Sequence, residues 1–198
     1  MSVAQRIFVI CLLPSLGACN MLISETAMFS DDDRAQVLPQ DGIWLSKDKD
    51  CEVDGGMPES YWPECALWVV VRGAGTDILL MDGKGQSESI GWLLAAGDPI
   101  ILQGRWIDTA KPPHRSVYGF YGIDPLKIGP DGRLLAVSVW PVECGTQSNA
   151  NDQIEPFPGI RPDCHVPSKD AIRAAARLSR RPDQISQWQW LRNEAPQY

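Results

Sequence analysis

The sequence has few of the features that identify an enzyme. Its 198 residues include only two histidines. They contain no G-x-S-x-G elbow, phosphate-binding loop, H-E-x-x-H zinc motif or dinucleotide fingerprint. Asp163, Cys164 and His165 are neighbours, but this is not the spacing of a preassembled catalytic triad. We therefore expect no catalytic residue and no cofactor, although acidic residues that converge in the fold leave a hydrolase open as an alternative.

A long apolar run is also missing. The N-terminal apolar segment, residues 7–23, is interrupted by Pro14, Gly17 and Asn20, whereas a membrane-spanning helix needs about 20 apolar residues. The segment contains Leu16-Gly17-Ala18-Cys19, which resembles the lipobox of bacterial lipoproteins.

The lipobox resemblance implies a defined place for the protein. Residues 1–18 are then removed as a signal peptide, and Cys19 carries acyl chains that hold the protein on a membrane. Because no aspartate follows Cys19, the resemblance favours the outer membrane, with the protein facing the periplasm. A signal peptide cleaved without lipidation and a membrane-spanning helix over residues 7–23 are the alternatives.

The cysteines are too widely spaced for a metal site of the usual kind. The sequence has six cysteines and no C-x-x-C pair, so we expect no metal. Cys11 lies in the signal segment and Cys19 at its end. The other four indicate two disulfides in an exported domain. Because each pair then closes a short loop, we favour Cys51 with Cys65 and Cys144 with Cys164.

Basic residues are scarce outside the C-terminal segment. The formal net charge is −7, yet residues 168–198 contain six Lys or Arg against three Asp or Glu. An acidic body argues against nucleic-acid binding and suits a cationic partner, and the basic segment suits an anionic surface. Simple solvation of both faces is the alternative. The candidate binding residues on the basic face are Arg173, Arg177, Arg180 and Arg181.

The chain divides into four regions. Residues 1–18 are the signal peptide, and residues 19–41 show no periodicity, so they are predicted to form a flexible tether after Cys19. Residues 42–167 predict a mainly β, single antiparallel domain, barrel-like or sandwich. Its expected strands are 43–46, 66–72, 76–81, 89–94, 99–106, 116–123 and 133–140. The alternation of glycine and aromatic residues at 118–122 indicates close packing.

Residues 168–198 are predicted to form an amphipathic helical segment that packs on the β domain. Ser168 is a suitable N-cap, and Pro182 ends the first helix. A second short helix is expected over 183–192, where Ile185, Trp188 and Leu191 recur at three-residue spacing.

Tryptophan is abundant, with eight residues. Five lie in predicted strands and are expected in the core. The best candidates for an exposed binding surface are Trp62, Trp188 and Trp190. Gly42-Ile43-Trp44 resembles the G-x-W sequence that begins lipocalin barrels. That resemblance implies a barrel closed at one end by Trp44, with a helix packed outside.

These observations predict an envelope lipoprotein with a non-catalytic domain. Its expected partners are the membrane, through the lipid on Cys19, and an envelope protein or the cell wall. Two alternatives stay open: a barrel that carries an apolar ligand and a hydrolase that works through carboxylates.

Overall fold

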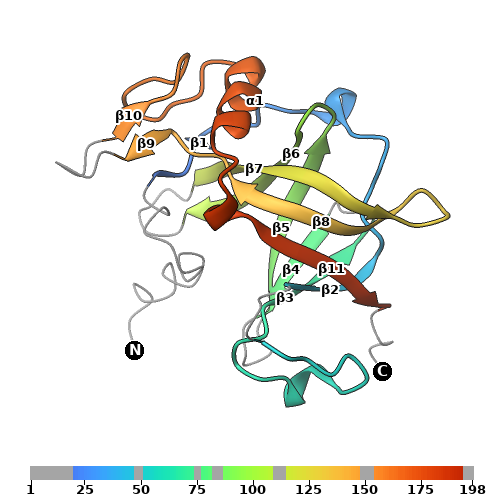
Figure 1. Ribbon diagram of the computed structural model, residues 1–198. Coiled ribbons are helices and arrows are strands. Elements are labelled where there is room, and N and C mark those ends of the chain that lie inside the picture. Colours follow the sequence, from blue (N-terminus) through green and yellow to red (C-terminus); the bar gives the residue numbers. More distant parts are fainter. Residues whose placement is uncertain are drawn as a thin grey trace.

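In the computed structural model, eight antiparallel strands form a closed barrel (Figure 1). The structure describes residues 20–46, 51–73, 77–81, 87–108, 115–147 and 154–193. Each strand pairs with the next in chain order, and the last strand pairs with the first, so the sheet has no free edge along most of its length. The barrel strands are β2 (Gly42–Ser46), β3 (Trp68–Arg72), β4 (Asp77–Met81), β5 (Ser87–Ala95), β6 (Ile100–Asp108), β7 (Arg115–Ile128), β8 (Leu134–Pro141) and β11 (Ser186–Arg192).

The mainly β fold class and the seven expected strands are confirmed, and the eighth strand corrects a prediction. Residues 186–192 form β11 instead of the expected second helix. β11 pairs with β8 and β2 and closes the barrel. A strand places residues i and i+2 on one face, so Trp188 and Trp190 lie on the same side, with Trp190 opposite Trp44. The order Gln187-Trp188-Gln189-Trp190 alternates with this period of two.

The inside of the barrel holds one of two apolar cores. Trp44 is buried, and its indole nitrogen donates to the Gln40 carbonyl at 2.8 Å. Trp188 and Trp190 pack against this core and are partly buried. The buried members of the inner core are Ala35, Trp44, Val71, Leu94, Leu102, Ile123, Leu134 and Val137.

A second core lies outside the barrel, under helix α1 (Lys169–Leu178). The predicted cap is confirmed, because the Ser168 side chain accepts a hydrogen bond from the Ala171 amide. α1 lies between β8 and β11 in the chain. Trp140 donates to the Ala176 carbonyl at 2.8 Å, and its ring lies so close to Gly122 of β7 that a Cβ at position 122 would clash with it. The alternation of glycine and aromatic residues in β7 thus reflects close packing.

Residues 20–41 are not a tether, and this prediction is wrong. The segment crosses the outside of the barrel and includes β1 (Ile23–Ser24), which pairs with β7. Leu22 and Phe29 are 0% and 2% exposed. Gln103 of β6 accepts hydrogen bonds from the Met28 and Phe29 amides and donates to the Phe29 carbonyl. Single apolar side chains and irregular backbone hydrogen bonds hold the segment, so no periodic pattern reveals it in the sequence.

Further along, the segment contacts other parts of the barrel. Backbone hydrogen bonds join Ala35 to Leu94 and Gln40 to Leu134. Asp33, in the 3-10 turn Asp31–Asp33, forms an ion pair with Lys169 of α1 at 2.7 Å. The Lys169 hydrogen bond, together with the Ser30 amide, lowers the pKa of Asp33. The segment therefore fastens α1 to the barrel.

Both predicted disulfides are present. Cys51 pairs with Cys65, and Cys144 pairs with Cys164. The second bridge belongs to the outer core, beside the small sheet of β9 (Gly145–Gln147) and β10 (Ile154–Pro156). Cys164 has a φ of 60°, a left-handed conformation that the bridge and the surrounding loop impose on a non-glycine residue.

Candidate functional site

Two groups of candidate residues lie at opposite ends of the molecule (Figure 1). At one end, α1, β9, β10 and the start of the described chain gather around the Cys144–Cys164 bridge. At the other end, residues 51–67 connect β2 to β3 and contain the Cys51–Cys65 bridge. We call the first group the anchor end and residues 51–67 the stapled loop.

The stapled loop is held against β11 by several contacts besides its disulfide. Arg192 forms an ion pair with Glu59 at 2.5 Å and donates to the Met57 carbonyl at 3.2 Å. Its guanidinium also lies 5.9 Å from the centre of the Trp62 ring. Gly55 lies so close to Leu191 of β11 that a side chain at position 55 would have to displace it. These contacts hold the loop against β11.

Trp62 packs within this loop and helps to hold it together. Its ring meets Trp68 edge-on at a centroid distance of 5.5 Å, and its indole nitrogen donates to the Asp54 carbonyl at 3.2 Å. The predicted binding residue Trp62 thus has a partly buried ring within the stapled loop.

The exposed aromatic side chain of the loop is Tyr61. It is 76% exposed, the largest exposed fraction among the large apolar side chains described. Met57 and Leu67 are also exposed, at 48% and 39%. Sequence reasoning missed Tyr61, because successive residues of the 3-10 turn Glu59–Tyr61 point in different directions and only the fold decides which ring is covered.

The stapled loop has a net negative charge. Residues 51–67 contain four acidic residues and no basic one. Glu52, Asp54 and Glu64 are exposed, and Glu59 is engaged by Arg192. Negative charge around an exposed tyrosine suits a cationic partner, since charge speeds the encounter and aromatic side chains supply binding energy.

The predicted arginine face of α1 is mostly used within the protein. Arg173 donates to the Ala96 carbonyl at 3.1 Å and lies over the Phe29 ring. Arg180 forms an ion pair with Asp124 and lies over the Trp140 ring. Arg181 forms an ion pair with Glu143 at 2.8 Å. Arg177 is exposed and forms no ion pair within the part of the chain that the structure describes.

Two arginines and two aspartates line a shallow cleft of about 230 Å³ between α1 and the barrel. Because Arg180 engages Asp124, the cleft does not offer two free carboxylates. Glu143 is 1% exposed, and this burial raises its pKa although Gln184 and Arg181 oppose the rise. A carboxyl group sealed from solvent does not reach a substrate. The lining residues are Asp98, Pro99, Asp124, Trp140, Arg177 and Arg180.

The inner core bears on the carrier alternative. Leu94, Leu102 and Ile123 are at most 8% exposed, and Trp92, Tyr121 and Trp188 pack against this core and are partly buried. Within the described ranges, no three His, Cys, Asp or Glu side chains converge as metal ligands. Among the same residues, no helix combines the length and the apolarity that a membrane crossing requires.

Comparisons with protein-family models, with curated proteins and with solved structures found no match.

Proposed function

We propose that the protein is a lipid-anchored envelope protein whose barrel binds a cationic protein through the stapled loop. The lipid is carried by Cys19 within Leu16-Gly17-Ala18-Cys19, and the membrane is the outer membrane, with the domain in the periplasm. The observation that carries the binding role is the exposure of Tyr61 on a disulfide-closed loop that contains four acidic residues and no basic one. The two disulfides agree with an oxidising compartment.

A surface role is favoured over the two alternatives. The buried side chains of the inner core occupy part of the barrel interior, which disfavours a carrier of a large apolar ligand. Asp124 and Glu143 are each engaged by an arginine, which disfavours a hydrolase built on these carboxylates. A rigid loop also loses little conformational entropy on binding.

The binding role is tested by calorimetric titration with a cationic bacteriolytic enzyme, lysozyme, and with an acidic protein of similar size. We expect lysozyme alone to bind, and its affinity to fall as the salt concentration rises. Tyr61→Ala is expected to weaken binding by about tenfold or more, as for an aromatic hot spot. The double variant Glu52→Gln/Glu64→Gln is expected to slow association.

The matched control is Leu126→Ala. Leu126 is 52% exposed on β7, away from the stapled loop, so its removal should leave the affinity unchanged. Absence of lysozyme binding, or equal losses in Tyr61→Ala and Leu126→Ala, would reject the proposed binding surface.

Lipid anchoring is tested separately by mass spectrometry of the mature N-terminus from bacterial membranes. We expect an acylated Cys19, and a Cys19→Ala variant that leaves the membrane fraction. An unmodified Cys19 on the mature protein would reject the anchor.

A further inference from the structure

Cys19 itself lies outside the described residues, which begin at Asn20, directly after the proposed lipid site. Asn20 is 4% exposed; its side-chain amide donates to the Gly145 carbonyl at 2.6 Å, and its own carbonyl accepts from the Cys144 amide at 2.7 Å. Leu22 then bonds to the Val142 carbonyl at 2.8 Å. Consecutive Cα atoms are about 3.8 Å apart, so a lipid on Cys19 is attached one residue from a fixed point of the fold.

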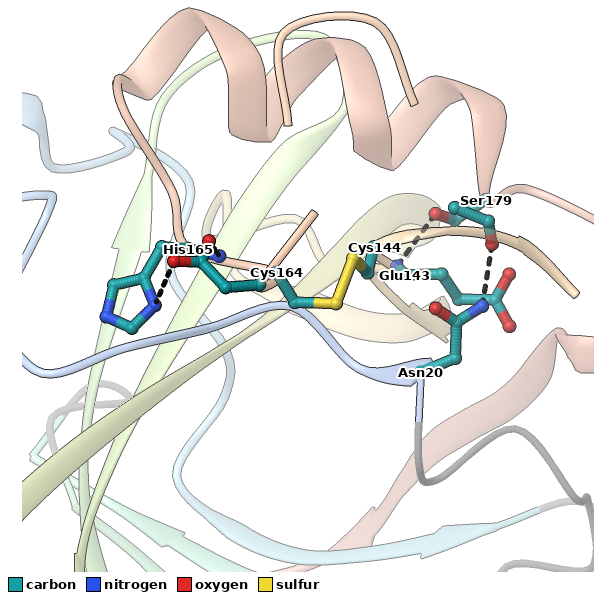
Figure 2. The surroundings of a disulfide bond; sticks show 8 residues. Asn20, Glu143, Cys144, Cys164, His165 and Ser179 are labelled. Carbon is teal, nitrogen blue, oxygen red and sulfur yellow. Dashed lines mark hydrogen bonds and ion pairs between the residues drawn. A yellow bond between two sulfur atoms is a disulfide. The ribbon is translucent and has the colours of Figure 1, made fainter. Parts of the chain in front are cut away.

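Asn20 lies among buried residues at the anchor end. Figure 2 shows Asn20, Glu143 and Ser179 gathered on one side of the Cys144–Cys164 disulfide, with His165 on the other. Glu143 accepts from Arg181, and its amide donates to the Ser179 hydroxyl at 2.8 Å. Met21 pairs with Glu143 in an isolated bridge. The first residues after Cys19 therefore cannot swing away from the domain without breaking buried contacts.

The surroundings of Asn20 also contain buried polar atoms that find no hydrogen-bond partner in the described part of the chain. Among the described residues, five buried polar side-chain atoms lack a hydrogen-bond partner, and four of them belong to this group: Asn20 Oδ1, Glu143 Oε2, Arg181 Nε and Gln184 Oε1. A buried polar group without a hydrogen-bond partner destabilises the fold, so additional polar groups are expected here. Amide and ester groups at the base of the acyl chains are polar groups of the required kind, and they are attached at the adjacent residue.

The arginines of α1 lie at the same end of the molecule. Arg181 is bonded to Glu143, which is the pairing partner of Met21. Arg177 is exposed in the last turn of α1. Arg180 is exposed two residues after the end of the helix. Near an anionic bilayer, each basic side chain contributes about 1 kcal/mol, which corresponds to about fivefold in partitioning. The stapled loop lies at the opposite end (Figure 1).

From these observations we infer that acylated Cys19 is seated on the domain without a linker. This inference rests on the proposed lipid anchor. The bilayer then faces the anchor end, with Arg177 at the anionic headgroups. The barrel is held in one orientation, and the stapled loop faces the periplasm. The membrane-bound protein thus presents Tyr61 to its partner at a constant height above the lipid surface.

The test measures how far each end lies from the bilayer. The full-length lipidated protein is placed in vesicles of phosphatidylethanolamine and phosphatidylglycerol that contain an acceptor-labelled lipid. A donor dye is attached in turn to Glu155→Cys, on exposed β10 at the anchor end, and to Ser60→Cys, in the exposed stapled loop. A domain of this size is about 40 Å across, so energy transfer should be strong from position 155 and weak from position 60.

The matched variant has about twenty Gly and Ser residues inserted between Cys19 and Asn20. Such a linker averages about 25 Å and frees the domain, so the difference between the two positions should disappear. Equal transfer from both positions in the native chain, or a difference that survives the linker, would overturn direct seating. Flotation of each protein with the vesicles is measured in parallel, because a protein that fails to float contradicts the lipid anchor itself.

Discussion

The two disulfides lie at opposite ends of one barrel. One belongs to the outer core, and the other closes the stapled loop. Cys144 is 0% exposed and belongs to the outer core with Leu22, whereas Cys65 is exposed in the stapled loop. Their closed loops are similar in length, with separations of 20 and 14 residues. Loop length alone predicts similar stabilisation of both. The difference teaches that the surroundings of a bridge decide whether its loss affects the whole domain or only one surface.

Removal of the two bridges is the most direct way to break this comparison. We expect Cys144→Ala/Cys164→Ala to lower the free energy of unfolding by about 4 kcal/mol and Cys51→Ala/Cys65→Ala by about 2 kcal/mol. The first change opens the outer core, while the second frees an exposed loop that regains entropy without unfolding the barrel. Urea denaturation measures both values.

The second pair of variants should also differ in lysozyme affinity. Loss of the loop's bridge is expected to weaken binding, since the loop must then be ordered on contact. Equal losses of stability in the two double variants would show that loop length, not burial, controls these bridges.

A smaller effect is expected from truncating one side chain at each end. Leu22→Ala removes a fully buried leucine from the outer core and should lower the free energy of unfolding by about 3 kcal/mol. Met57→Ala, in the stapled loop, should change it by no more than about 0.5 kcal/mol, because Met57 is 48% exposed. Urea denaturation provides the measurement. A Leu22→Ala variant as stable as the native chain would restore the picture of residues 19–41 as a flexible tether.

The smallest expected effect is the pH-dependent stability that Asp33 contributes through its contact with Lys169. The Lys169 hydrogen bond lowers the pKa of Asp33, so ionised Asp33 stabilises the fold above the ordinary aspartate pKa. This contribution is lost as the pH falls through the lowered pKa of the folded state. Asp33→Asn should therefore be less stable than the native chain at pH 6, and the difference should shrink toward pH 3.

Glu143 should contribute to stability with a pH dependence opposite to that of Asp33. Burial raises the pKa of Glu143, so the fold favours its protonated form. The stability contributed by that protonation is full below the ordinary glutamate pKa and is lost as the pH rises through the raised pKa.

A difference between Asp33→Asn and the native chain that grows toward pH 3 would contradict the role of the Lys169 contact.

Much of the barrel could be predicted from the sequence, because its strands are built from local patterns. Short β-branched and aromatic runs between turns predicted seven strands, and Ser168 predicted the start of α1. β11 was missed because Ile185, Trp188 and Leu191 imitate a helical spacing. In β11 the polar and aromatic residues alternate, and this period of two was the signal that could have identified the strand.

The candidate site was less predictable for a physical reason. Residues 20–41 have no periodic pattern, since Leu22 and Phe29 are buried singly against distant strands. The choice between Trp62 and Tyr61 as the exposed ring depends on Arg192, which is 130 residues away in the chain. Neither arrangement leaves a local signal.

The sequence alone determined seven of the eight barrel strands, the helix start and the local pairing of the four cysteines, because these depend on periodicity, capping and short loops. The tertiary structure decided three other matters. It turned the segment after Cys19 into part of the outer core, it made residues 186–192 the strand that closes the barrel, and it left Tyr61 exposed. Each depends on contacts between residues far apart in the chain, for which local chemistry provides no pattern.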